Sequence, residues 1–225
     1  TGVGKTFVAC GIAGVLRDAG YRIGVMKPVE SGCAEIDGKL VPEDAVRLQG
    51  ASGCQAPLEK ICPYPLRDAL APSIAAERQG ISIDIDRLMN VYSEISAAHD
   101  LTLVEGAGGL MVPLLPSYTY ADLAKLLKIP LIVVAANKLG AINHLLLTLE
   151  HAACKELPTL GYVLNNLAAA PSPAAETNRD TLSTLTAAVC LGELSFHDAT
   201  AVGELRALFA EQFDFKVVEA VVRNF

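Results

Sequence analysis

The sequence begins with residues suited to binding phosphate, Gly2-Val3-Gly4-Lys5-Thr6, and they lead directly into a predicted helix. Glycines let backbone amides approach a phosphate closely, and the positive end of a helix favours an anion. The Lys5 ammonium can reach the β- and γ-phosphates of a nucleotide, and the Thr6 hydroxyl can bind Mg²⁺. An ordinary glycine-rich turn is the alternative. The helix that follows the glycines favours a phosphate-binding loop (P-loop).

Glu105 is a second candidate for chemistry, because it ends the apolar run Leu101 to Val104 and precedes glycine-rich residues 106–109. A carboxylate at the end of a buried strand can hold Mg²⁺ beside nucleotide phosphates. An exposed glutamate in a turn is the alternative, and on its own Glu105 would leave the two interpretations equal. The P-loop in the same chain favours the metal role.

Two other charged residues carry weaker signals. Lys27 follows a predicted strand, where its ammonium would provide positive charge for an anionic substrate or a transferring phosphoryl group. In isolation, a solvated lysine would be the better interpretation. Asp44 stands at the start of a predicted helix, where an acidic residue usually serves only as a cap. The residues alone give Asp44 no functional role.

Two later segments present amide groups at predicted strand ends. Gly140 precedes a predicted helix, whose first backbone amides would suit a carboxylate. These amides belong to Ala141, Ile142 and Asn143. His144 could be read as a catalytic base, although a single histidine at a helix start is more often structural. The side-chain amide of Asn165 could pair with the edge of an adenine or cap the next turn.

Alternating strands and helices are predicted to position these residues. Expected helices cover residues 5–19, 42–48, 71–78, 83–99, 120–127 and 141–155, with another inside 171–188. Expected strands cover 22–28, 101–105, 129–136, 160–164 and 189–194, and residues 54–66 are expected to be irregular. This order predicts an α/β fold, a doubly wound and mostly parallel sheet with helices on both faces. Ligands bind such sheets at the carboxyl ends of the strands, where Lys27, Glu105, Asn137 and Asn165 are expected to meet.

We expect one domain over residues 1–225, with a helical tail at 197–225 and a short buried strand before Thr1. The chain has 225 residues, 52% of them apolar, and a net charge of −7. This acidic balance and the absence of tryptophan argue against a nucleic-acid partner. No apolar run is long enough to cross a membrane. The six cysteines lack CxxC spacing, which argues against a zinc site or a redox dithiol. Several lie in apolar runs, so we expect buried, reduced thiols, and we expect a cytoplasmic protein.

The motifs, taken in order, resemble those of dethiobiotin synthetases across nearly the whole chain, up to about Leu194. They are T-G-V-G-K-T at 1–6, K-P-V-x-S-G at 27–32, an Asp-Ala pair at 44–45, V-E-G-A-G-G at 104–109, a proline at 113, T-Y-A-D at 119–122, K-L-G-x-I-N-H at 138–144, G-Y-V-x-N at 161–165 and L-G-E at 191–193. Several motifs in one order are much more specific than a P-loop alone.

This resemblance implies a P-loop NTPase fold and an ATP-dependent ligase of biotin biosynthesis. Its substrates would be 7,8-diaminononanoate, CO₂ or bicarbonate, and ATP. One amine forms a carbamate, which attacks the γ-phosphate to give a carbamic-phosphoric anhydride. The second amine then attacks the carbonyl, phosphate leaves, and the ureido ring of dethiobiotin closes. Such phosphoryl transfer needs positioning and charge neutralisation more than covalent chemistry from the protein.

The resemblance also implies a role for each matching residue. Catalysis falls to Lys27, Lys5 and Thr1. ATP binding falls to Gly2, Val3, Gly4, Lys5, Thr6 and Asn165, with Asn165 reading adenine. Mg²⁺ binding falls to Thr6, Asp44 and Glu105. Substrate binding falls to Ser31, Gly108, Gly140, Ala141, Ile142 and Asn143, the last four from the neighbouring subunit of a homodimer with two shared sites.

Three other functions compete with this one. A cobyrinate-type amidating synthetase would need a glutaminase domain, for which the chain is too short. A septum-positioning or chromosome-partitioning switch ATPase carries K-G-G-x-G-K-T, and Thr1 stands at the second residue of that loop, where the switch ATPases have glycine. Such switches also use basic or amphipathic contacts, and none is evident in this sequence. A P-loop fold without catalysis is disfavoured by the joint presence of Lys5, Thr6, Lys27, Asp44 and Glu105.

Overall fold

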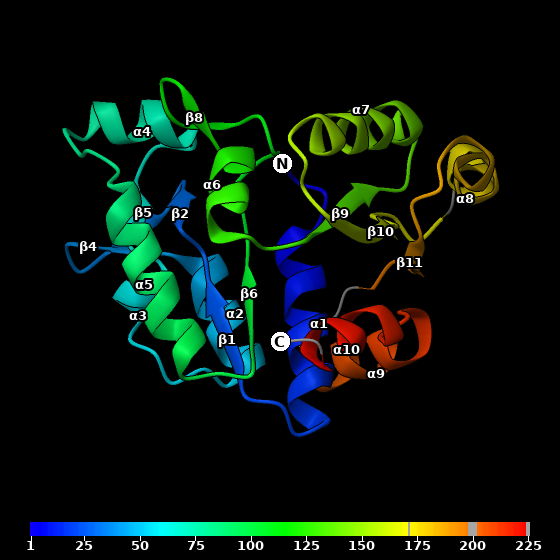
Figure 1. The fold of residues 1–225 in the computed structure, drawn as a ribbon, viewed down its shortest axis with the longest axis horizontal. Helices are drawn as coiled ribbons and strands as arrows, with labels where there is room; N and C mark the ends of the chain where they lie inside the picture. The colour runs from blue at the N-terminus through cyan, green and yellow to red at the C-terminus, as the bar shows by residue number, and fades with distance from the viewer. Residues whose placement is uncertain (171, 198–201, 224–225) are drawn as a thin grey trace.

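A computed structural model describes residues 1–170, 172–197 and 202–223. The predicted alternation is confirmed, and the longer strands form two parallel groups (Figure 1). In the first group β1 (Ile23–Met26) pairs with β6 (Leu101–Val104). In the second, β10 (Thr159–Asn165) lies between β9 (Leu131–Ala136) and β11 (Cys190–Leu194). The α/β class with parallel strands agrees with the sequence prediction.

Helices cover both faces of the first group, and alternating side chains of β1 pack against them. Ile23 and Val25 point into a cluster with Leu48 of α2 (Glu43–Ser52), which packs together with α1 (Lys5–Asp18). Met26 joins a second cluster with Leu88 of α5 (Ile85–Ala97). Successive strand residues face opposite sides of a sheet, so one short apolar strand serves two cores.

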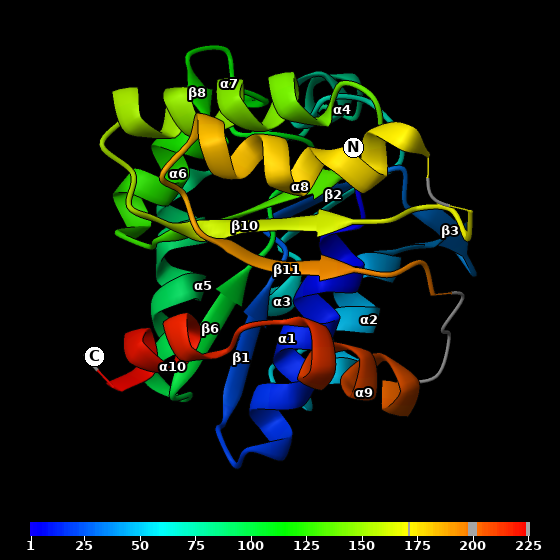
Figure 2. The same ribbon diagram turned by 90° about the vertical axis from the view of Figure 1, so that its right-hand side faces the viewer.

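The second group is also covered on both faces (Figure 2). Helices α7 (Ala141–Cys154) and α8 (Pro173–Leu185) lie on one side, where Leu145 and Leu182 pack with Tyr162 and Leu164. On the other side α9 (Val202–Gln212) packs against α1, and the ring of Phe209 lies where Gly11 has no side chain. A final helix, α10 (Lys216–Arg223), follows. Parallel strands buried on both faces explain the high apolar content of the chain.

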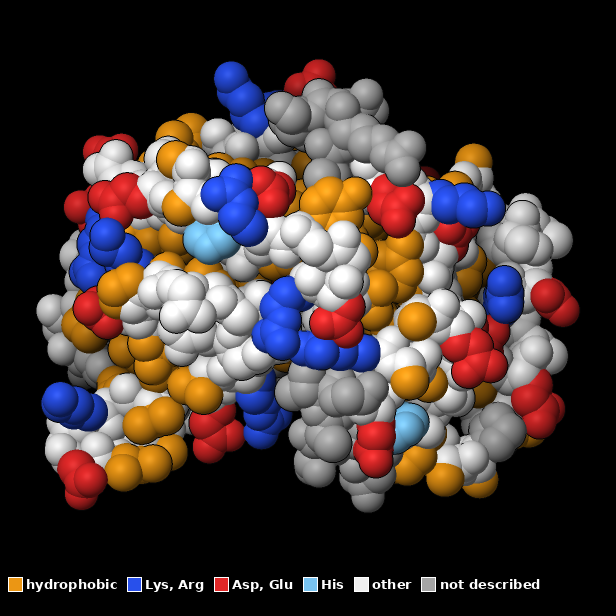
Figure 3. All heavy atoms as spheres, turned by 90° about the horizontal axis from the view of Figure 1, so that it is seen from below, with side chains coloured by type: hydrophobic (Ala, Val, Ile, Leu, Met, Phe, Trp, Pro, Cys, Tyr) orange, Lys and Arg blue, Asp and Glu red, His pale blue; other side chains and the backbone are white. Residues whose placement is uncertain are grey.

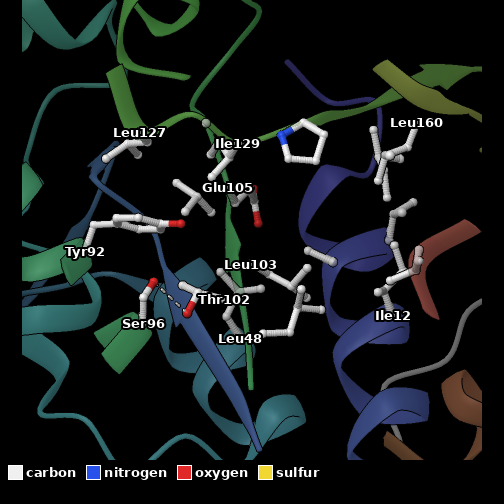
Figure 4. Close-up of a pocket in the computed structure, with 18 of the residues that line it drawn as sticks. Ile12, Leu48, Tyr92, Ser96, Thr102, Leu103, Glu105, Leu127, Ile129 and Leu160 are labelled. Carbon is white, nitrogen blue, oxygen red and sulfur yellow. Dashed lines mark hydrogen bonds between the residues drawn. The ribbon is translucent and has the colours of Figure 1, made fainter. Parts of the chain in front are cut away.

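A cavity of about 520 Å³ separates the two strand groups. Figure 4 shows Ile12 of α1 and Leu103 of β6 at this cavity, with Ile129 and Leu160 on the side of β9 and β10. Within the described residues, β6 and β9 pair on one edge only, and their other edges border this apolar slot. A slot of this lining would accommodate the strand expected before Thr1, which remains a prediction. The candidate site residues Lys5 and Glu105 also line this cavity.

One sequence expectation about local structure is wrong. Residues 54–66 contain a short helix, α3 (Leu58–Ile61), and a strand, β5 (Tyr64–Leu66), which pairs in parallel with β2 (Val29–Ser31). The three prolines of this segment argued against regular structure. Pro65 lies opposite Glu30 in a two-stranded pair, and proline is tolerated on such edge strands. The buried Tyr64 and Leu66 side chains then fix the strand.

The remaining elements are small. Helices α4 (Pro72–Arg78) and α6 (Tyr120–Leu127) match the prediction, whereas two hairpins were not expected. The hairpin strands are β3 (Ala34–Ile36), β4 (Lys39–Val41), β7 (Pro113–Leu115) and β8 (Tyr118–Thr119). Figure 3 shows acidic and basic side chains interspersed on the face seen from below. Across the described ranges, no helix has the length and apolar character needed to cross a membrane.

Candidate active site

The parallel pairing of β1 and β6 places Lys27 beside Glu105. Met26 and Val104 are register partners, so the residues that follow them leave the sheet at the same edge. Lys27 Nζ donates to Glu105 Oε1 at 2.5 Å and to Asp44 Oδ2 at 2.9 Å. The Thr6 hydroxyl donates to the same Glu105 oxygen at 2.8 Å. Four residues that lie far apart in the sequence therefore form one polar cluster.

The cluster keeps Lys27 charged although its side chain is only 4% exposed. Burial disfavours the ammonium, but the negative charges of Glu105 and Asp44 outweigh burial and raise the pKa of Lys27. Burial also pushes the pKa of Asp44 upward, yet the nearby Lys27 charge, with hydrogen bonds from Lys27 and Thr6, makes the net shift downward. A buried ammonium is therefore fixed where the strands end, which is the arrangement that stabilises developing negative charge.

The cluster also has the oxygen atoms that Mg²⁺ prefers. Glu105 Oε2 is buried and has no hydrogen-bond partner in the described structure, so one carboxylate oxygen is available for a cation. Asp44 and the Thr6 hydroxyl border the same space. Among the described residues, no three histidine, cysteine or acidic side chains group closely enough to hold a metal alone. Mg²⁺ sites in proteins usually consist of one or two carboxylates together with substrate phosphates.

The P-loop enters α1 through Gly4, which has a left-handed conformation with φ of 87°. A side chain at Gly4 would collide with the Asn165 amide, so glycine is required there for two reasons. Asn165 Nδ2 in turn donates to the carbonyl of Val3 at 3.0 Å. Burial and the nearby Lys27 charge lower the pKa of Lys5, with Glu105 and Asp44 opposing. Lys5 and Lys27 therefore concentrate positive charge around the loop.

The Asn165 contact gives this residue a role that the sequence did not indicate. Its side chain is buried and holds the P-loop backbone, whereas its role in reading adenine remains a prediction. We expect Asn165→Ala to weaken binding of both ATP and inorganic triphosphate about fivefold, because one buried hydrogen bond is worth roughly 1 kcal/mol. Titration calorimetry with both ligands measures this. Weaker binding of ATP with unchanged binding of triphosphate would assign Asn165 to the base alone.

The other predicted residues divide into two places. Thr1 and Gly2 are exposed at the start of the loop. Ser31 ends β2, and Gly108 has a left-handed conformation that Val112 packs against. Gly140 and residues 141–143 begin α7, in the half of the molecule built on β9 to β11 (Figure 1). The structure shows no contact between this helix start and Lys27.

The start of α7 leaves two of the three amides that were predicted to bind a carboxylate, because the Ala141 amide is already used. Gly140 is left-handed with φ of 92°, and the amide of Ala141 donates to the carbonyl of Lys138 at 3.0 Å. The amides of Ile142 and Asn143 belong to the first turn, where a helix offers no acceptor of its own. These two amides, together with the helix dipole, favour an anion.

Sequence reasoning missed an amide network at the same edge of the sheet. Asn178 of α8 donates to Asn137 Oδ1 at 2.9 Å, and Asn137 Nδ2 donates to Glu193 and Asn166 at 3.1 Å each. The network joins the ends of β9, β10 and β11 to α8. A polar residue at each strand end was the only sequence signal, and it does not reveal the partners. A satisfied buried network of this kind makes the edge rigid.

The P-loop at a helix start, the strand-end acid beside it and the layered parallel strands define a P-loop nucleotide-binding protein. Solved structures agree on this fold. The chain resembles the cell division ATPase MinD of Pyrococcus furiosus, with a TM-score of 0.56 and 13% identity over 98% of this chain and 95% of that one. Apo McdA of Cyanthece has a TM-score of 0.55 at 13% identity, over 98% and 95% of the two chains. At such identity the likeness concerns the fold alone.

Sequence relatives are more specific. A family model described as an AAA domain matches residues 1–201. The ATP-dependent dethiobiotin synthetase of Anaeromyxobacter dehalogenans strain 2CP-C is 42% identical over 186 residues, which is 83% of this chain and 82% of that protein. The ATP-dependent dethiobiotin synthetase of Bacillus cereus strain G9842 is 38% identical over 199 residues, which is 88% of this chain and 81% of that protein. The chain belongs to the ATP-dependent dethiobiotin synthetase family, as its motifs predicted.

Proposed function

We propose that this protein closes the ureido ring of dethiobiotin from 7,8-diaminononanoate, CO₂ and ATP. Family membership supports the reaction, and the cluster of Thr6, Lys27, Asp44 and Glu105 beside the P-loop supports its chemistry. All six cysteines are free thiols, which suits a reducing compartment, and we place the reaction in the cytoplasm.

The reaction would run in two steps at this cluster. A carbamate formed from one amine and CO₂ attacks the γ-phosphorus of ATP, the bond to the bridging oxygen breaks, and ADP leaves. The second amine then attacks the carbonyl carbon, the carbon–oxygen bond to phosphate breaks, and the amine protons pass to solvent. Lys27 would provide fixed positive charge to the carbamate and the transferring group, because its ammonium is already buried and oriented.

The phosphates would be held at the start of α1. Backbone amides after Gly4 and the Lys5 ammonium would bind the β- and γ-phosphates, as in other P-loops. Mg²⁺, when bound by Thr6, Asp44 and Glu105, would neutralise charge on these phosphates. Thr1 and Ser31 would lie beside the carbamate, and Asn165 would fix the loop in addition to contacting adenine.

We further propose a homodimer in which the start of α7 from one subunit binds the carboxylate of the substrate held by the other. In support, α7 packs on β9 whereas Lys27 follows β1 in the other strand group, and Leu139, beside the α7 start, is 86% exposed. Met111, in the loop after the glycine-rich segment, is 69% exposed. Large exposed apolar side chains beside a site often belong to an interface.

Mixing two inactive variants tests the shared site. Asn143→Pro removes one first-turn amide at a position where proline is tolerated, and Lys27→Ala removes the ammonium. After exchange of subunits, we expect about a quarter of the wild-type rate, because one site of each heterodimer has both intact residues. The rate is followed by phosphate release. A mixture as inactive as its parents, despite exchange shown by mass spectrometry, would contradict the shared site.

A single assay separates the synthetase from a switch ATPase, whose fold this chain also resembles. Phosphate release is measured with Mg-ATP and bicarbonate, with and without 7,8-diaminononanoate, and the product mass is recorded. We expect release to require the diamine and the product to be heavier by one carbonyl and lighter by two hydrogens. Release that is indifferent to the diamine, with no new product, would favour the switch.

A further inference from the structure

Glu30 is a buried carboxylate that the proposed reaction does not use. It lies on β2, three residues after Lys27, at the variable position of the K-P-V-x-S-G motif. Its residue is only 7% exposed. Burying a carboxylate costs free energy unless strong hydrogen bonds compensate, so a buried glutamate needs an explanation from its partners.

Both partners of Glu30 belong to the first turn of α2. Glu30 Oε1 accepts from the amide of Asp44 at 2.9 Å, and Oε2 accepts from the amide of Ala45 at 3.1 Å. The residue that precedes α2, Pro42, makes no side-chain cap. Glu30 therefore supplies from a neighbouring strand the cap that the helix lacks locally.

This contact joins the two parts of the chain that carry the candidate metal and phosphoryl-transfer residues. Glu30 is held in β2 by pairing with β5, and Lys27 lies just before that strand. Asp44 is bound through its backbone to Glu30 and through its side chain to Lys27. The Asp44 carboxylate is therefore contacted by Lys27 and Thr6, while Glu30 holds the Asp44 backbone without involving the reacting groups.

We propose that Glu30 is a positioning residue, which fixes the first turn of α2 so that the Asp44 carboxylate is held in place for a divalent cation beside Glu105. The inference rests on the proposed function for the cation role of Asp44. A cap with no link to the site is the alternative. The chain offers a matched control, because Asp84 Oδ1 accepts from the amides of Asp86 and Arg87 at the start of α5.

The test measures cation binding apart from turnover. Mn²⁺ binding to the complex with a non-hydrolysable ATP analogue is followed by electron paramagnetic resonance, and thermal unfolding is recorded for each variant. We expect Glu30→Ala to weaken Mn²⁺ binding about tenfold, as loss of a residue that orients a metal ligand commonly does. Glu30→Gln keeps one acceptor oxygen and should lose less. Asp84→Ala should lower the melting temperature but keep Mn²⁺ affinity within about twofold, since its helix carries no ligand.

The opposite pattern would overturn the inference. If Glu30→Ala and Glu30→Gln lower the melting temperature as Asp84→Ala does, and Mn²⁺ affinity is unchanged, then Glu30 is only a cap. If Glu30→Ala does not fold, the Mn²⁺ affinity of Glu30→Gln alone decides between the two interpretations. Mn²⁺ binding does not require the diamine, so the result is independent of whether the product is dethiobiotin.

Discussion

Replacing Lys27 should reduce turnover by on the order of 10²–10³-fold while ATP binding changes little, because one preorganised electrostatic group commonly contributes that much. The Lys27 ammonium is fixed by Glu105 and Asp44 before any ligand arrives, so the protein need not reorganise during transfer. The P-loop amides and Lys5 would still hold the nucleotide. The measurement compares kcat with the Kd of a non-hydrolysable ATP analogue in Lys27→Ala and Lys27→Met.

The same substitution should also destabilise the fold. Glu105 would keep a buried charge without its partner, and breaking a buried ion pair costs about 3–5 kcal/mol. Lys27→Met keeps the side-chain volume and separates this charge effect from a cavity. Lys60 is a matched surface control, since it pairs with Glu94 with both side chains about half exposed. Lys60→Met should leave turnover unchanged. Wild-type turnover in a folded Lys27→Met would remove Lys27 from the mechanism.

Glu105→Gln should reduce turnover by on the order of 10²-fold and raise the Mg²⁺ concentration needed for half-maximal rate. Glutamine preserves the shape and one acceptor, but it puts a neutral amide where a buried carboxylate oxygen has no partner. Titration of the rate with Mg²⁺, at saturating ATP, measures both effects.

Glu94→Gln provides the control for Glu105, because this exposed glutamate lies on α5 and forms its ion pair with Lys60. The Glu94→Gln variant should need the same Mg²⁺ concentration for half-maximal rate as the wild type. An unchanged Mg²⁺ requirement in Glu105→Gln would show that the cation is bound elsewhere. A lower rate with an unchanged Mg²⁺ requirement would leave Glu105 a role only in holding Lys27.

Local patterns in the sequence predicted the elements that carry the site. Glycines mark the P-loop and the start of α7. A charged residue after an apolar run marks the strand ends at Lys27 and Glu105. Asp44 shows the limit of such patterns. Its type and position indicate only a helix cap, and its contact with Lys27 depends on how α2 packs against β1.

Contacts between distant segments could not be predicted from the residues alone. The Asn165 bond to Val3 joins positions that are 162 residues apart, and no local pattern encodes it. Glu30 stands at a variable motif position, where nothing marks it as a helix cap. The strand β5 was not predicted because proline argues against a strand. An edge strand such as β5 nevertheless tolerates proline. Tertiary packing decided each of these cases.

The most direct test of the proposed reaction follows the oxygen atoms of CO₂. The protein is mixed with the diamine, Mg-ATP and CO₂ labelled with the heavy oxygen isotope, and the reaction is stopped before the label exchanges with water. If a carbamate oxygen attacks the γ-phosphorus, one labelled oxygen appears in phosphate and one in the ring carbonyl for each ring formed. Phosphate without label would mean that water attacks ATP, and it would contradict a carbamate intermediate at this site.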